Sequence, residues 1–188
     1  KDMKFMGYIR PDKVGGIVNS FKYKGLTVRV VMDWAMGHVI DNGFKGQIMG
    51  SSRNNNNAIK DAMTNSWQSA NDGTKYPKYT VQSDYDYQYR NHMRWDNQIG
   101  SSESGSTNNS LYFSKGDYLA FREVSLSYML PSTWVRKIRL SGVEVFAGAY
   151  NIGYIKKYDG MFPEIYTGVD YGVYPRPRQY NMGVKINF

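Results

Sequence analysis

The chain has 188 residues, of which 15% are aromatic, with 19 glycines, no cysteine and a formal net charge of +8. The lack of cysteine excludes disulfides, thiolate metal sites and cysteine nucleophiles within this sequence. The positive charge would suit nucleic acid or an anionic membrane. However, the basic residues are scattered, and no basic run is longer than Lys156-Lys157, which gives no support to nucleic-acid binding.

The composition combines a polar mean hydropathy of −0.59 with 17 tyrosines, 8 phenylalanines and 4 tryptophans. A membrane barrel wall has both features, because it needs apolar residues only at alternate positions, aromatic residues at the membrane interfaces and polar residues elsewhere. A tyrosine-rich secreted binding module has the same composition. Composition therefore leaves both classes open.

No stretch approaches the roughly 20 apolar residues of a membrane helix, whereas a spanning strand needs only about 9–11 alternating residues. The opening residues, Lys1-Asp2-Met3-Lys4, do not begin the apolar run of a signal peptide. We therefore expect either a cytoplasmic protein or a chain whose natural N-terminus lies upstream, and the resemblance described below favours the second.

Period-two alternation predicts the first two strands at residues 17–23 and 26–36. Lys24-Gly25 between them suits a tight hairpin turn. In the second strand one face carries only apolar residues: Leu26, Val28, Val30, Met32 and Trp34.

Residues 41–116 form a long polar stretch rich in Asn, Ser, Gly and Tyr. We expect a long loop here, and within it an aromatic cluster that is the best candidate for direct contact with a ligand, since aromatic faces stack on sugar rings and on peptide side chains. The alternative is that these rings pack the loop against itself or against a lid protein. The cluster consists of Tyr76, Tyr79, Tyr85, Tyr87, Tyr89 and Trp95.

Three further strands are predicted at 117–129, 138–152 and 178–188. A short link with Pro131 joins the first two, and a second long loop, 153–175, precedes the last. The last strand alternates most cleanly, with Asn181, Gly183, Lys185 and Asn187 on one face. The other face, expected to contact lipid, carries Tyr180, Met182, Val184, Ile186 and Phe188.

Short and long connections therefore alternate along the chain. Compact soluble domains seldom carry structureless loops beyond about 15 residues, whereas outer-membrane barrels have short periplasmic turns and long extracellular loops. If the last strand ends on the periplasmic side, both short links fall in the periplasm, and both 41–116 and 153–175 fall outside the cell.

Several ordered motifs resemble the SusC/RagA family of TonB-linked outer-membrane proteins. Residues Pro11–Leu26 resemble its "P…GG..NSF.YKGF" strand and turn, and Gly116–Pro131 resemble "G.YLRLKNVTLGYTLP". Residues Asn151–Glu164 resemble "QNL…TKY.G.DPE", and Asp170–Arg178 resemble "D.G.YP.PR". The resemblance covers Met6–Gly37 and Gly116–Phe188.

The resemblance implies an all-β fold: the C-terminal strands of a large, 22-stranded transmembrane barrel with long extracellular loops. Family members carry an N-terminal plug and a TonB-contacting segment, both absent from this sequence, and a SusD-type surface lipoprotein caps them. The implied function is TonB-dependent import of an oligosaccharide or a peptide across the outer membrane of a Gram-negative bacterium. The implied partners are the rest of the barrel and its plug, the lipoprotein, the TonB complex and the lipid bilayer.

No motif supports an enzyme, a cofactor or a metal site. His38 and His92 lie far apart, and Asp84-Tyr85-Asp86 lacks the glycine and the glutamate of a calcium loop. Asn108 begins a glycosylation sequon of a kind that arises often by chance, and Gly100–Gly105 lacks the lysine of a phosphate loop. The alternative function, from another class, is a soluble secreted β-rich module that binds glycans.

Overall fold

The structure, a computed structural model, describes residues 4–49, 60–74 and 110–188. The chain divides into two compact units. The sheet unit consists of Pro11–Gly37, Gly116–Lys157 and Tyr174–Phe188, and the loop unit of Lys1–Arg10, His38–Lys115 and Tyr158–Val173. No helix among the described residues is long and apolar enough to cross a membrane.

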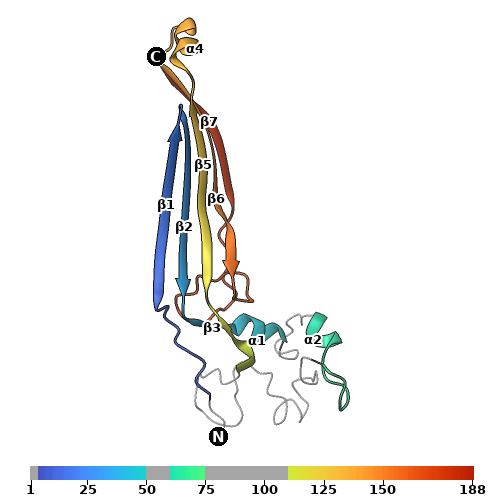
Figure 1. The fold of residues 1–188 in the computed structure, drawn as a ribbon. Coiled ribbons are helices and arrows are strands. Elements are labelled where there is room, and N and C mark those ends of the chain that lie inside the picture. The colour runs from blue at the N-terminus through green and yellow to red at the C-terminus, as the bar shows by residue number, and fades with distance from the viewer. Residues whose placement is uncertain (1–3, 50–59, 75–109) are drawn as a thin grey trace. The chain divides into compact units, whose positions relative to one another are not determined.

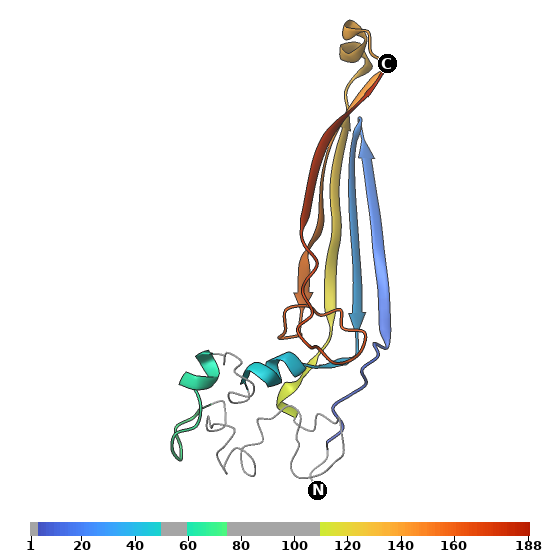
Figure 2. The ribbon, with the colours of Figure 1, turned by 180° about the vertical axis from the view of Figure 1, so that it is seen from behind.

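The sheet unit is built on one antiparallel sheet with the strand order β1-β2-β5-β6-β7, shown in Figures 1 and 2. Each strand pairs with its neighbour along the sheet. The strands are β1 (Lys13–Tyr23), β2 (Leu26–Met36), β5 (Tyr118–Met129), β6 (Gly142–Lys156) and β7 (Gln179–Asn187). The described part of the chain is thus dominated by antiparallel strands, which confirms the all-β class.

The predicted start of the first strand, at residue 17, is too late, because β1 begins at Lys13. Gly15 and Gly16 look like strand breakers in the sequence. In the fold Gly15 lies opposite Trp34, and a Cβ placed on Gly15 would clash with the indole ring. The aromatic ring therefore covers the glycine across the strands and continues the sheet through it.

The connections at one end of the sheet are short. Lys24 (φ 45°) and Gly25 (φ 87°) form the β1–β2 turn, and positive φ at both central positions is the geometry that suits the twist of a hairpin. The β5–β6 link contains a helical turn, α4 (Ser132–Val135) and η3 (Arg136–Ile138). The predicted strand at 138–152 is therefore wrong at its start, because β6 begins only at Gly142 and then runs on to Lys156.

The pairing of β2 with β5 contains a β-bulge. Val31 lies opposite Glu123, but the next residue, Met32, lies opposite Phe121, so Arg122 is the extra residue. Because side chains alternate between faces, Phe121 without this bulge would lie on the face of Glu123. The bulge instead keeps Phe121 on the same face as Met32.

The loop unit contains short elements where the sequence predicted only polar loop. They are β3 (Val39–Asp41), α1 (Gly43–Met49), α2 (Lys60–Thr64), η2 (Ser110–Tyr112) and β4 (Phe113–Lys115). β3 pairs with β4, and Asp41 also forms a bridge with Val169 from the other predicted loop. Among its described residues, the buried apolar side chains include Ile40, Tyr112, Tyr158, Phe162 and Ile165. Few apolar residues, far apart in sequence, make this core, which is why hydrophobic periodicity did not reveal it.

Substitution of Gly25 by alanine should destabilise the β1–β2 hairpin by about 1–2 kcal/mol, because alanine disfavours the left-handed conformation. The added Cβ would also lie 2.7 Å from the carbonyl oxygen of Met129. Lys24→Asn is the matched control, since asparagine tolerates positive φ, and it should be neutral or slightly stabilising. The denaturant midpoint of the full-length protein measures both, and equal midpoints for the two variants would contradict the turn geometry.

Candidate functional site

One face of the sheet is apolar across all five strands. Because paired residues in an antiparallel ladder lie on the same face, the register defines rows of side chains that run across the sheet. One row consists of Tyr23, Leu26, Tyr128, Val145 and Val184, and the next of Phe21, Val28, Leu126, Ala147 and Met182.

These apolar side chains are exposed in the structure. Tyr23 is 69% accessible, Leu126 46% and Met182 86%. Monomeric soluble proteins rarely expose apolar patches larger than a few hundred Å², and this one spans the whole sheet. The face is therefore built to be covered by something apolar.

The opposite face of the sheet is polar. A shallow groove of about 300 Å³ runs over it. Arg29, which lines this groove, forms an ion pair with Glu123, with Nε 3.4 Å from Oε2. The Ser125 hydroxyl donates to the other oxygen of Glu123 at 2.8 Å. The groove is lined by Ser20, Thr27, Arg29, Ser125, Leu126, Ser127, Phe146, Ala147, Gly148, Tyr150 and Asn181.

The bulge places a second charged cluster in the sheet unit. The Arg122 guanidinium donates to both oxygens of Asp33, at 2.5 and 2.8 Å, which is the bidentate geometry that favours arginine over lysine. Arg122 also reaches the Tyr154 hydroxyl at 3.3 Å. Tyr154 in turn packs edge-on against the buried Tyr118, with ring centroids 6.0 Å apart.

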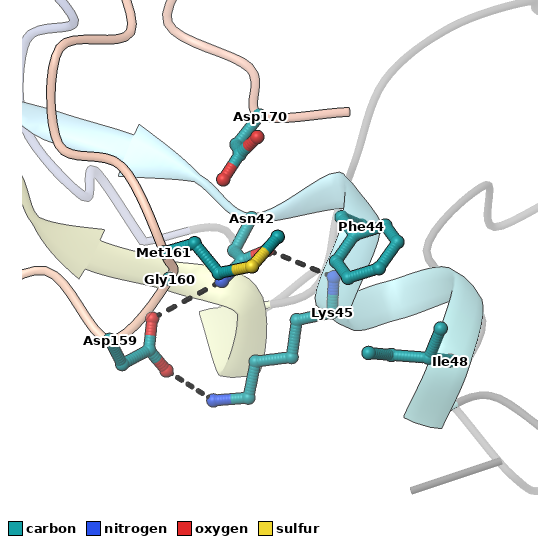
Figure 3. A pocket seen from close by; sticks show the side chains of 8 residues that line it. All are labelled: Asn42, Phe44, Lys45, Ile48, Asp159, Gly160, Met161 and Asp170. Atoms are coloured by element: carbon teal, nitrogen blue, oxygen red, sulfur yellow. Dashed lines mark hydrogen bonds and ion pairs between the residues drawn. The ribbon is translucent and has the colours of Figure 1, made fainter. Parts of the chain in front are cut away.

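The loop unit contains a pocket of about 290 Å³ between α1 and the segment around Asp159, shown in Figure 3. Phe44, Ile48 and Met161 supply its apolar wall. Asn42 caps α1, because its side-chain oxygen accepts the Lys45 backbone N–H at 2.9 Å.

Asp159 connects the elements that form this pocket. It accepts hydrogen bonds from Lys45 Nζ at 2.5 Å, from the Ser114 hydroxyl at 2.7 Å and from the Asn42 amide at 3.3 Å. Burial raises the pKa of Asp159, but the hydrogen bonds from Lys45 and Ser114 and the charge of Lys45 outweigh it, so the pKa lies below its ordinary value. The carboxylate is thus held ionised as a structural acceptor.

Asp170, on the same pocket, is equally engaged. One oxygen accepts the backbone N–H groups of Gly172 and Val173, and the other accepts the Tyr158 hydroxyl at 2.6 Å. Burial and the neighbouring carboxylates raise the pKa of the Tyr158 phenol, which keeps it a neutral donor. Among the described residues, no three His, Cys, Asp or Glu side chains gather into a metal-binding group. The hydrogen bonds of Asp159, Asp170 and Tyr158 thus fix the polar side of the pocket.

The aromatic cluster predicted for ligand contact, from Tyr76 to Trp95, lies outside the described residues, as does His92. The alternate residues of the last strand do lie on one face of β7, although Phe188 follows the end of the strand at Asn187. The pocket in the loop unit was not predicted. Asn42 before Gly43 carries the one sequence signal for it, a helix N-cap, and Asp159 belongs to a motif that carried the family resemblance.

No family model matches the chain. It is 25% identical over 199 aligned residues to TonB-dependent receptor P3 of Formosa agariphila, covering 100% of this chain and 17% of that protein. It is 26% identical over 91 residues to TonB-dependent receptor SusC of Bacteroides thetaiotaomicron, covering 48% of this chain and 9% of that protein.

Among solved structures, the RagAB peptide importer in its open-open state matches 98% of this chain with a TM-score of 0.70 and 20% identity. A further RagAB structure matches 96% of it with a TM-score of 0.71 and 21% identity. The chain is therefore similar, over its whole length, to a section of the SusC/RagA type of TonB-dependent receptor. It spans 17% of the length of the Formosa agariphila receptor and 18% of the RagAB chain in the open-open state.

The hydrogen bonds and the ion pair of Asp159 predict how the stability of the loop unit depends on pH. A carboxylate with a lowered folded pKa contributes stability above its unfolded value of about 3.8, and that contribution is lost as the pH falls through the folded pKa. Amide hydrogen exchange of residues 41–49 and 158–173 in the full-length receptor should therefore stay protected from pH 7 to pH 5.

Asp159→Asn should remove that protection at pH 7, because it ends the ion pair with Lys45. Asp72→Asn is the matched control, because within the described part of the chain Asp72 accepts hydrogen bonds from its own turn, from Gln68, Ser69 and Thr74. Equal protection of α1 in both variants would contradict the role given to Asp159.

Proposed function

We propose that the full protein imports a bulky nutrient, an oligosaccharide or a peptide, across the outer membrane of a Gram-negative bacterium. In this proposal the TonB complex supplies the work through a plug outside this sequence. The chain contributes a section of barrel wall and part of the extracellular mouth. The observation that carries the proposal is the exposed apolar face, which is continuous over the five strands while the opposite face is polar.

The dimensions of the sheet support a membrane-spanning role. A strand of 11 residues, such as β1 or β2, rises about 36 Å at roughly 3.3 Å per residue. The apolar band of an outer-membrane barrel is about 25 Å tall, so these strands cross it with residues to spare. The apolar face would contact lipid, and the face with Arg29 and Glu123 would line the lumen.

The edges of the sheet support a larger barrel. β1 and β7 are the edge strands of the described sheet, and an open edge in lipid leaves backbone groups unsatisfied at several kcal/mol each. Further strands of the same receptor would therefore pair with both edges. A soluble glycan-binding module, the competing function, would need another layer to cover an apolar face of this extent.

The lengths of the connections orient the proposed wall. Lys24-Gly25 and the link that contains α4 leave one end of the strands, and residues 37–117 and 157–178 leave the other. Barrels of this kind have short periplasmic turns and long extracellular loops. We therefore place the loop unit outside the cell, where it would meet cargo and a SusD-like surface lipoprotein.

Contact with cargo or with this lipoprotein is proposed for the aromatic cluster of residues 76–95. The partly apolar pocket beside Phe44 and Met161 adds a second place on the loop unit where an apolar group can enter. The RagAB relative is described as a peptide importer, which is compatible with a peptide cargo for this receptor.

The assignment of faces predicts unequal effects of neighbouring substitutions in β7. Val184→Arg should impair assembly, costing about 2–4 kcal/mol if the side chain lies at mid-bilayer. Lys185→Gln, on the other face, is the matched control and should be mild. Heat-dependent gel migration of the full-length receptor measures folding of both, and equal impairment would show that the faces are wrongly assigned.

The function itself is tested by removing residues 73–95 from the extracellular loop. We expect weaker uptake of cargo or weaker co-purification of the surface lipoprotein, with an unchanged heat-shifted barrel band, because the sheet unit contributes no residue to the deleted segment. Normal uptake and normal lipoprotein binding would exclude the aromatic cluster from transport. Loss of the barrel band would show that the cluster serves packing.

A further inference from the structure

The short-connection end of the sheet is strongly basic. Lys24 lies in the β1–β2 turn, and Arg136, Lys137 and Arg139 lie in the β5–β6 link, where all of them are exposed. No acidic residue occurs between Leu130 and Val143. Backbone hydrogen bonds hold the two connections at one end, from Met129 N–H to the Gly25 carbonyl at 2.8 Å and from Ser141 N–H to the carbonyl of Asn187 at 2.9 Å.

Two of these cations occupy backbone conformations that disfavour them. Lys24 has φ 45° and Arg139 has φ 59°, in the left-handed region that costs an ordinary residue about 1–2 kcal/mol. Among the described residues, the other non-glycine residues with positive φ are Asn71 and Asn151, and asparagine tolerates that region. In the sheet unit, the described basic residues with this unfavourable backbone conformation therefore lie in the two short connections.

Arg139 sits where a glycine would be expected. The N–H of Leu140 bonds to the Val135 carbonyl, and the N–H of Arg139 to the Arg136 carbonyl. This pair of bonds is the Schellman motif, which usually ends on glycine at the position of Arg139. The backbone geometry of this turn therefore gives no reason to prefer arginine over glycine.

Apolar side chains accompany the cations. Val135 anchors the helical turn, being 2% accessible, whereas Trp134 and Ile138 are 62% and 64% accessible. The last row of the apolar face lies next to this turn and carries Tyr23 and Tyr128, and Lys24 Nζ lies 5.3 Å from the Tyr23 ring centroid. Aromatic residues beside cations at the limit of an apolar band are typical of a membrane–water interface.

We propose that this end of the sheet is a binding surface for the anionic headgroups of phospholipids in the periplasmic leaflet of the outer membrane. Trp134 and Ile138 would enter the headgroup region. The four exposed cations would bind lipid phosphates, namely Lys24, Arg136, Lys137 and Arg139. The inference rests on the proposed function for its membrane topology. Its own support is the charge complementarity and the continuity of this patch with the apolar face. The basic excess that nucleic-acid binding does not explain is here partly accounted for.

The test is the affinity of the full-length receptor, purified in detergent, for phosphatidylglycerol and for phosphatidylcholine, titrated in native mass spectrometry. The variant is Lys24→Asn combined with Arg139→Gly, whose new residues suit the left-handed backbone better than the native ones. Each cation near a lipid surface is worth about 1 kcal/mol, so binding of phosphatidylglycerol should weaken roughly 30-fold. Binding of phosphatidylcholine should change by less than about threefold.

The matched control removes two cations from the other end of the same strands, Lys13→Gln with Lys156→Gln, and should leave phosphatidylglycerol binding within about twofold. A second variant, Arg136→Gln with Lys137→Gln, keeps the native turn backbone and should weaken binding as the first does. Unchanged binding in both turn variants, or equal loss in the control, would overturn the proposal. Retention of lipopolysaccharide at this end instead would overturn it too, by placing the turns outside the cell.

Cargo uptake by the unmodified receptor tests the proposed function separately. If the receptor imports cargo but the turn variants bind lipid normally, only the proposed lipid-binding surface is contradicted. If the receptor binds phosphatidylglycerol selectively but imports no cargo, only the proposed transport function is contradicted.

Discussion

The side-chain register of the five-stranded sheet is the constraint on which the rest of the structure depends. A shift by one residue in any strand would move its apolar side chains to the other face. A continuous apolar surface therefore requires each pair of strands to align apolar residues with apolar residues. The bulge at Arg122 preserves this alignment, because the extra residue places Phe121 on the same face as Met32. The same extra residue directs a guanidinium to Asp33 on the other side of the sheet. One backbone irregularity thus serves both the apolar and the polar face.

The loop unit follows a different logic from the sheet. It is assembled from three separate stretches of chain, and polar groups hold much of its described part together. Asp159 joins α1 to β4, and Asp170 is fixed by Tyr158 and by two backbone N–H groups. A charged network of this kind is specific in geometry but adds little net stability for each exposed pair. Such a unit can hold a defined surface in water, which the proposed contact with cargo requires.

Much of the sheet could be predicted from the sequence because period two is a direct consequence of strand geometry. The range predicted for β2 is the observed one, and the alternate residues from Tyr180 to Ile186 share a face as expected. The prediction failed where tertiary contacts decide. Gly15 stays in β1 because Trp34 covers it, and the helical turn after Pro131 delays β6 to Gly142. The pocket around Asp159 brings together residues more than a hundred positions apart, which no local pattern reveals.

The central claim, that one face of the sheet contacts lipid and the other does not, is tested most directly by spin labels along β7. Single labelled cysteines would be placed in turn at residues 181 to 186 of the full-length receptor in lipid bilayers. Accessibility to dissolved oxygen should peak at Met182, Val184 and Ile186, and accessibility to a water-soluble nickel chelate at Asn181, Gly183 and Lys185. Equal exposure of all six positions to the chelate, with no period of two, would contradict a barrel wall.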